Sequence, residues 1–145
     1  MAILDAQLAY SDAQALTATA ASTNLVDHGI DGDFGVGVPM VCVLSLDVAA
    51  DGTTGDETYT VDLEADDNSS FSSAVTVGSA TITRGDAAGT KYFINVPPSA
   101  STERYSRLNF TLAGTTPTAT VTARLVPLSF VQASDQYYAS GFTVS

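Results

Sequence analysis

Two acidic stretches have residue types and spacings that could bind calcium. They are "DHGIDGD", with Asp27, Asp31 and Asp33, and "DGTTGDE", with Asp51, Asp56 and Glu57. Calcium takes roughly six to eight oxygen ligands, often from carboxylates on flexible loops. Neither stretch has the D-x-[DN]-x-[DN]-G spacing of an EF-hand. We therefore expect solvated turns, with no metal and no cofactor.

Other chemistry would depend on single residues. His28 is the only histidine, so a Ser-His-Asp triad could use this residue alone, and a zinc site with several histidines is excluded. We expect His28 to be a turn residue hydrogen-bonded to its neighbours. Cys42, the only cysteine, lies in the apolar run "VPMVCVLSL", which predicts a buried thiol without a disulfide. The RGD tripeptide at Arg84 is explained by turn chemistry. No phosphate-binding loop is present, and an enzyme is not expected.

Charge is distributed unevenly along the chain. The first 83 residues contain 13 acidic and no basic residues, a charge of −13, and the remainder carries +2, which gives −11 overall. This balance argues against direct nucleic-acid binding, because phosphate contacts need concentrated Lys and Arg. It fits either a solvated acidic surface or docking onto a basic partner. The longest apolar run has 7 residues, too few for a spanning helix, so no membrane contact is expected.

The elements that must position these residues are strands. Apolar and polar residues alternate in "TYTVDLEA", "KYFINV", "SRLNFTL" and "TATVTARL", which is typical of half-buried antiparallel strands. Clusters of Gly, Pro, Asn and Asp separate them and predict turns. The pattern predicts an all-β fold, a jelly-roll β-sandwich of about eight antiparallel strands, with a closed barrel as the second choice.

The N-terminal stretch "SDAQALTATAASTN" is ambiguous. Its alanines favour a helix, whereas Leu16, Ala18 and Ala20 alternate with threonines as in a strand. We expect an extended N-terminal arm over residues 1–15 and one β-sandwich domain over residues 16–145. The arm is expected to serve attachment rather than folding, so deletion of residues 2–10 should leave the domain folded. Pro127 predicts an edge strand or a bend near "RLVPLSF".

Several blocks in the same order resemble one known family. They are "YSDAQALTATAASTNLVDHG", "TTGDETYTVDLEADDNSSFSSA", "ERYSRLNFTLAGTTPTATVTARL" and "DQYYASGFTVS". These blocks are similar to the capsid cement proteins of tailed bacteriophages, in the family typified by the Bordetella phage cement protein. The resemblance covers nearly the whole chain and is vaguest over residues 30–40. It implies a jelly-roll protein without catalysis or cofactor.

The resemblance also implies a location and partners. A cement protein is made in the host bacterial cytoplasm and binds the outer surface of the capsid across neighbouring major capsid protein subunits. It forms homo-oligomers, for which we expect a homodimer, with a trimer as the alternative. No short motif of the family transfers contact residues to this chain.

Candidate interface residues therefore come from side-chain chemistry alone. Aromatic and apolar side chains outside the regular alternation could anchor an interface, although core packing would explain them equally. Arg104 and Arg107 could pair with carboxylates of a partner or of this chain. The full set of candidates is Leu4, Leu8, Tyr10, Arg104, Arg107, Tyr137, Tyr138 and Phe142.

Two other functions are compatible with the sequence. A carbohydrate-binding jelly-roll module of a virion or cell surface would need an aromatic platform, and the chain has no Trp and no secretion signal. A calcium-dependent structural or enzymatic domain would use the Asp-rich stretches described above.

Overall fold

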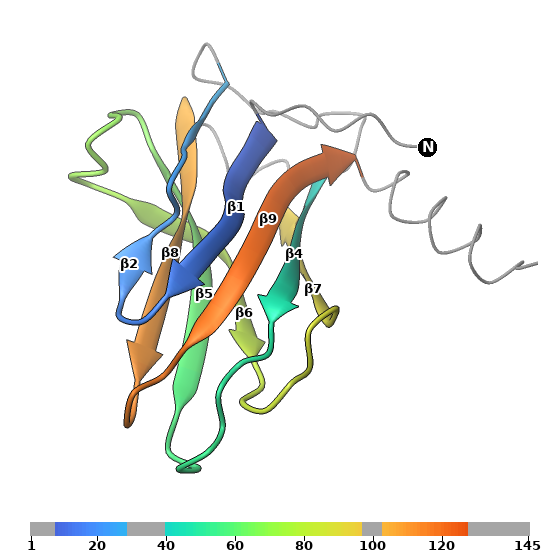
Figure 1. Cartoon of the computed structure of the whole chain (residues 1–145). Coiled ribbons are helices and arrows are strands. Elements are labelled where there is room, and N and C mark those ends of the chain that lie inside the picture. Colours follow the sequence, from blue (N-terminus) through green and yellow to red (C-terminus); the bar gives the residue numbers. More distant parts are fainter. Residues whose placement is uncertain (1–7, 29–39, 97–102, 128–145) are drawn as a thin grey trace, which may run out of the picture.

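The computed structural model describes residues 8–28, 40–96 and 103–127, which form two packed antiparallel β-sheets (Figure 1). The strands are β1 (Ala9–Leu16), β2 (Ala20–Ala21), β3 (Val26–Asp27), β4 (Met40–Val48), β5 (Thr58–Asp66), β6 (Val75–Ile82), β7 (Lys91–Val96), β8 (Tyr105–Ala113) and β9 (Ala119–Pro127). No α-helix occurs in these ranges. The predicted all-β sandwich is confirmed, and the helical alternative for the N-terminal stretch is wrong.

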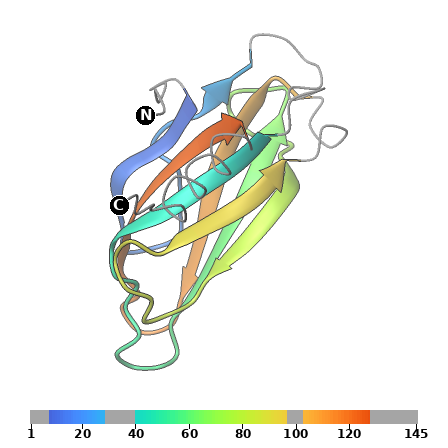
Figure 2. The same cartoon turned by 90° about the vertical axis from the view of Figure 1, so that its right-hand side faces the viewer.

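The strand order is that of a jelly roll. Sheet A has the order β1-β9-β4-β7 and sheet B the order β2-β8-β5-β6, with β3 also paired to β8 (Figure 2). The pairs are nested along the chain, because β1 pairs with β9, β2 and β3 with β8, β4 with β7, and β5 with β6. A long hairpin that rolls up on itself adds the pairs β4–β9 and β5–β8, which the structure also contains.

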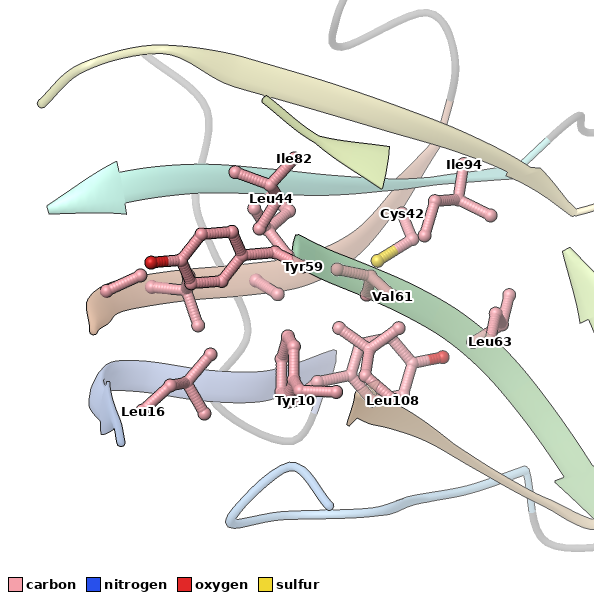
Figure 3. Close-up of a cluster of buried hydrophobic side chains, with 14 of the residues drawn as sticks. Tyr10, Leu16, Cys42, Leu44, Tyr59, Val61, Leu63, Ile82, Ile94 and Leu108 are labelled. Carbon is pink, nitrogen blue, oxygen red and sulfur yellow. The ribbon is translucent and has the colours of Figure 1, made fainter. Parts of the chain in front are cut away.

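The core lies between the two sheets, where alternating side chains of both meet (Figure 3). Every second residue of β5 points inward, which buries Tyr59, Val61 and Leu63. The facing sheet contributes Cys42 and Leu44 from β4. Cys42 is fully buried as expected, and burial raises the pKa of its thiol to about 12. This thiol is therefore a small apolar core group, not a nucleophile.

The sandwich begins earlier in the chain than expected. Residues 9–15, placed in the arm by the sequence prediction, belong to β1 and pair with β9 from Ala9 onward. Tyr10 in this strand is fully buried in the core (Figure 3). A large aromatic side chain becomes buried here because a shift in the register between Ala9 and Ser11 lets both Tyr10 and Ser11 be buried. Residues 1–7 of the predicted arm lie outside the described residues.

Pro127 does not mark an edge strand. It is the last residue of β9, which lies between β1 and β4 in sheet A. The final pairing of β9 with β1 is at Arg124, so the missing N–H of Pro127 interrupts no hydrogen bond to that neighbour. Whether the chain bends beyond Pro127 concerns residues outside the described ranges.

Candidate functional site

The acidic loop between β4 and β5 uses its carboxylates to hold its own backbone. The side chain of Glu57 is buried and accepts hydrogen bonds from the N–H groups of Thr54 and Gly55, each at 2.9 Å, and from the Thr54 hydroxyl. Asp51 accepts from the N–H of Thr53 at 3.2 Å. Because the hydrogen bonds stabilise the ionised carboxylate, chiefly that of the Thr54 hydroxyl, the pKa of Glu57 is lowered.

Asp56 connects this loop to the turn between β8 and β9. Its carboxylate accepts hydrogen bonds from the N–H of Thr115 at 3.0 Å and from the Thr115 hydroxyl at 2.9 Å. The bond from the Thr115 N–H is the main reason that the pKa of Asp56 is lowered. The carboxylates of this stretch thus close a loop-to-loop contact at one end of the sandwich. Within the described ranges, no three His, Cys, Asp or Glu side chains group as metal ligands would.

The second acidic stretch is described only in part. Asp27 forms a bidentate ion pair with Arg104, with Nε–Oδ1 and Nη2–Oδ2 distances of 2.8 and 2.9 Å. Asp31 and Asp33 lie outside the described residues.

Arg84, Gly85 and Asp86, the RGD tripeptide, form part of the turn between β6 and β7. Gly85 has a φ of 81°, which a glycine adopts readily, and its N–H donates to the carbonyl of Ala50 at 2.9 Å. The carboxylate of Asp86 accepts a hydrogen bond from the Tyr92 hydroxyl. Turn chemistry accounts for this motif, as the sequence predicts.

His28 ends a hydrogen-bonded chain that reaches into the core. Its Nε2 lies 3.0 Å from the hydroxyl of Ser106, and that hydroxyl lies 2.8 Å from the hydroxyl of Tyr10. The Ser106 side chain is only 1% exposed, so a substrate cannot reach its oxygen. The pair of Ser106 and His28 therefore connects β8 to the chain after β3 and to β1, and it does not form an accessible nucleophile. Partial burial lowers the pKa of His28, while nearby Asp27 opposes that shift.

Stability should consequently fall as the pH drops below the ordinary pKa of histidine, about 6.5. The unfolded chain takes up the proton at that pH, whereas the folded state resists it because the His28 pKa is lowered. In the variant His28→Gln, chemical denaturation should show a flatter pH dependence between about pH 6.5 and 5. A separate loss near and below pH 4 should persist, since the lowered pKa values of Asp56 and Glu57 are unaffected. Equal slopes for the two proteins between pH 6.5 and 5 would contradict this assignment.

The two candidate arginines form pairs within the chain. Arg107 donates from Nε to the Glu64 carboxylate at 2.9 Å and lies over the ring of Phe71, with 4.3 Å from its Cζ to the ring centroid. Arg104 pairs with Asp27 and lies 5.0 Å from the ring centroid of Tyr105. Both arginines therefore pair with carboxylates of their own chain, one of the two possibilities that the sequence leaves open.

The remaining interface candidates separate into core residues and residues without a described position. Tyr10 cannot contact a partner, because its side chain is 0% exposed; its proposed interface role is replaced by a core role. Leu8 is half-buried and packs against the core cluster. Leu4, Tyr137, Tyr138 and Phe142 lie outside the described residues. In the described part of the chain, the predicted interface residues therefore do not form one continuous surface.

The outer faces of the two sheets differ in chemistry. On sheet B, paired outward residues form polar rows: Thr111, Thr60 and Thr81; Asn109, Asp62 and Ser79; Arg107, Glu64 and Thr76. No aromatic side chain occurs in these rows, whereas a carbohydrate platform is commonly built from aromatic rings. The rows are polar, and two aromatic side chains lie beside them: Phe71 packs against Arg107, and Tyr105 pairs with Asp66 beyond the Arg107 row.

Sheet A, the nearer sheet in Figure 2, has apolar residues on its outer face. Phe93 of β7 pairs with Val43 of β4, and Val43 pairs with Arg124 of β9. Phe93 is 47% exposed, which is unusual for a large aromatic side chain, and Val43 is half-buried. In the adjacent row, Val41 and Val126 pair with each other and lie outside the inter-sheet core cluster, but both are buried, so they do not belong to the exposed surface. We call the group of Val43, Phe93, Lys91 and Arg124 the sheet A patch.

Sequence reasoning missed this patch, although a signal for it existed. Alternation in "KYFINV" puts Tyr92 and Ile94 on the core side and therefore Phe93 on the outside. An aromatic residue at an outward position of an alternating strand is the observation that could have identified it.

Comparison with known proteins gives one family. The model of the Bbp16 family matches residues 10–125, which contain every strand except the first residue of β1 and the last two of β9. A search of curated proteins finds no match. In the described ranges, no helix is long and apolar enough to cross a membrane.

Proposed function

The chain belongs to the Bbp16 family of Bordetella phage proteins, and from this membership we propose that it is a capsid cement protein of a tailed bacteriophage. It binds the outer surface of the head across neighbouring major capsid protein subunits and stabilises the shell against the pressure of the packaged genome. The observation that carries the proposal is the family match over residues 10–125, and the jelly-roll topology of the same residues is consistent with it.

The physical principle is linkage. A protein that binds the assembled lattice but not the separated subunits stabilises the lattice by mass action. A contact across two subunits meets this condition, because separating the subunits breaks it. The stiffness of a two-sheet sandwich suits the task, since a rigid module resists the relative movement of the subunits to which it is bound.

We propose that the protein acts as a homo-oligomer, a dimer by preference. Once one protomer of an oligomer is bound to the capsid, binding of the next protomer becomes intramolecular, and the gain in avidity can reach roughly 10² to 10⁴. Modest contacts per protomer then suffice for stable attachment. A net charge of −11 opposes uncontrolled self-association of the free protein in the cytoplasm.

We also propose that the protein catalyses no reaction. Three side chains of the described ranges that could act as nucleophile or as acid or base have structural roles instead. The hydroxyl of Ser106 is buried, the Cys42 thiol is in the core, and Glu57 holds a turn.

The test uses phage heads that lack this protein. Adding the purified protein is expected to saturate binding at a fixed number of copies per capsid subunit, and to raise the temperature at which filled heads release DNA. Filled heads and empty expanded heads should be compared, because the protective effect should be larger where internal pressure acts. Absence of the protein from purified virions, or binding without any change in the release temperature, would refute the cement function.

A further inference from the structure

We propose that the sheet A patch is the docking surface of this protein, and that it fits a protein surface whose apolar centre is flanked by carboxylates. The inference rests on the proposed function and deepens it, since it assigns a face of the sandwich and a partner chemistry to the attachment. Exposure of the patch, its charge and the poor fit of other partners support it.

The first observation is the exposure of Phe93. An aromatic ring that is 47% exposed in a regular strand loses the free energy that its burial would provide. The ring has an accessible apolar neighbour, because the half-buried Val43 lies directly beside it in the register. Exposed aromatic side chains with apolar neighbours are typical of interface centres.

The second observation is the charge around the ring. Lys91 lies two residues before Phe93 on the same face of β7, and Arg124 flanks Val43 on the other side. Among the described residues neither forms an ion pair, whereas Arg104 and Arg107 each pair with a carboxylate. Two carboxylates lie beside the patch: Asp47 accepts a hydrogen bond from Thr122, and Asp12 lies in the β1 bulge opposite Thr122. The four residues of the patch contain two cations and no carboxylate in a chain of charge −11, so carboxylates of a partner would complement Lys91 and Arg124.

A second copy of the chain is a poor occupant. A twofold contact would place identical patches against each other and would bring Lys91 and Arg124 of both copies together. Edge-to-edge pairing through β7, the outer strand of sheet A, is also disfavoured, because an exposed lysine on an edge strand opposes it. Nucleic acid and anionic lipid are disfavoured, because two cations on a strongly acidic protein offer little binding to a phosphate array.

The experiment measures binding of variants to heads that lack the protein. Phe93→Ser and Arg124→Glu should each weaken binding by about tenfold or more, because they remove the anchor and reverse a charge. The matched controls are Val75→Ser, an apolar residue 57% exposed on β6 of sheet B, and Arg84→Glu, an exposed cation in the β6–β7 turn. Both controls should bind within about twofold of the unmodified protein. Thermal unfolding of each variant verifies that the domain is folded.

The outcomes distinguish this inference from the function on which it rests. Wild-type binding that weakens with rising NaCl, lost in the patch variants and kept in the controls, supports the inference. If the wild type binds and all four variants bind equally well, the patch assignment is wrong and the cement function stands. If the wild type does not bind heads, both the patch assignment and the cement function are wrong. If the patch variants instead reduce the mass of the free oligomer in light scattering, the face belongs to a second copy and the assignment is overturned.

Discussion

Replacing Tyr10 by alanine is expected to lower the free energy of unfolding by about 3–5 kcal/mol, the range observed for large aromatic residues removed from packed cores. Tyr10 lies in β1, its side chain is fully buried, and it packs with residues of both sheets. The change would leave a cavity next to Leu16 and Leu108, which a two-sheet core cannot close without moving whole strands. Urea denaturation followed by circular dichroism measures the difference.

Tyr10→Phe is the matched control for this substitution. It keeps the ring and removes only the hydroxyl, whose partner Ser106 retains its bond to His28. The expected loss is about 0.5–1.5 kcal/mol, the net value of one hydrogen bond. Equal destabilisation by alanine and phenylalanine would show that the hydroxyl network, not packing, is what Tyr10 contributes.

The same residue decides how the N-terminal region can be tested. The sequence predicts that deletion of residues 2–10 leaves the domain folded, but in the structure this deletion removes a core residue and the start of β1. Such a deletion should therefore destabilise the domain at least as much as Tyr10→Ala. Loss of attachment to heads by that deletion would report on folding and not on docking.

Gly114→Ala is expected to lower the free energy of unfolding by about 3–4 kcal/mol, roughly 10 °C in melting temperature for a chain of this size. Gly114 has a φ of 101°, which an alanine adopts only with strain. A Cβ at this position would also lie 2.5 Å from the carbonyl oxygen of Asp56 and 2.7 Å from the Cα of Glu57. Both are backbone atoms, so relief would require the two loops to separate.

Gly89→Ala separates the cost of the strained backbone conformation from the cost of the steric overlap. Gly89 has a φ of 93°, close to that of Gly114, but a Cβ added to it would meet no atom within 4 Å. It therefore carries the conformational cost alone, about 1–2 kcal/mol. Calorimetry of the two variants should show a clearly lower melting temperature for Gly114→Ala. Equal melting temperatures would mean that the contact between the two loops is not tight.

The Gly114 contact also bears on the acidic loop. Asp56 and Glu57 hold their backbone through hydrogen bonds, and the close approach of Gly114 places Thr115 where it can donate to Asp56. The carboxylates that suggested calcium chemistry are thus part of a packed end of the sandwich. This end is an element of stability, and the sheet A patch, on a different surface, is the element proposed for attachment.

The class of fold and most of the core residues can be predicted from the amino-acid sequence alone. Alternation with a period of two is a local property, and it correctly assigned Tyr59, Val61 and Leu63 of β5 to the core. The burial of Cys42 followed in the same way, from its place in an apolar run. The family resemblance rested on ordered blocks of residues and required no coordinates, and the match over residues 10–125 confirms it.

Contacts between residues far apart in the chain become visible only in the folded structure. Tyr10 and Ser106 are 96 positions apart, and Asp56 and Thr115 are 59 apart, so no local pattern could reveal their hydrogen bonds. The register shift in β1 made Tyr10 a core residue although it precedes the regular alternation. The pairing of β7, β4 and β9 brought Phe93, Val43 and Arg124 into one row. Partners of this kind depend on strand order and register, which many side chains set together and no single segment encodes.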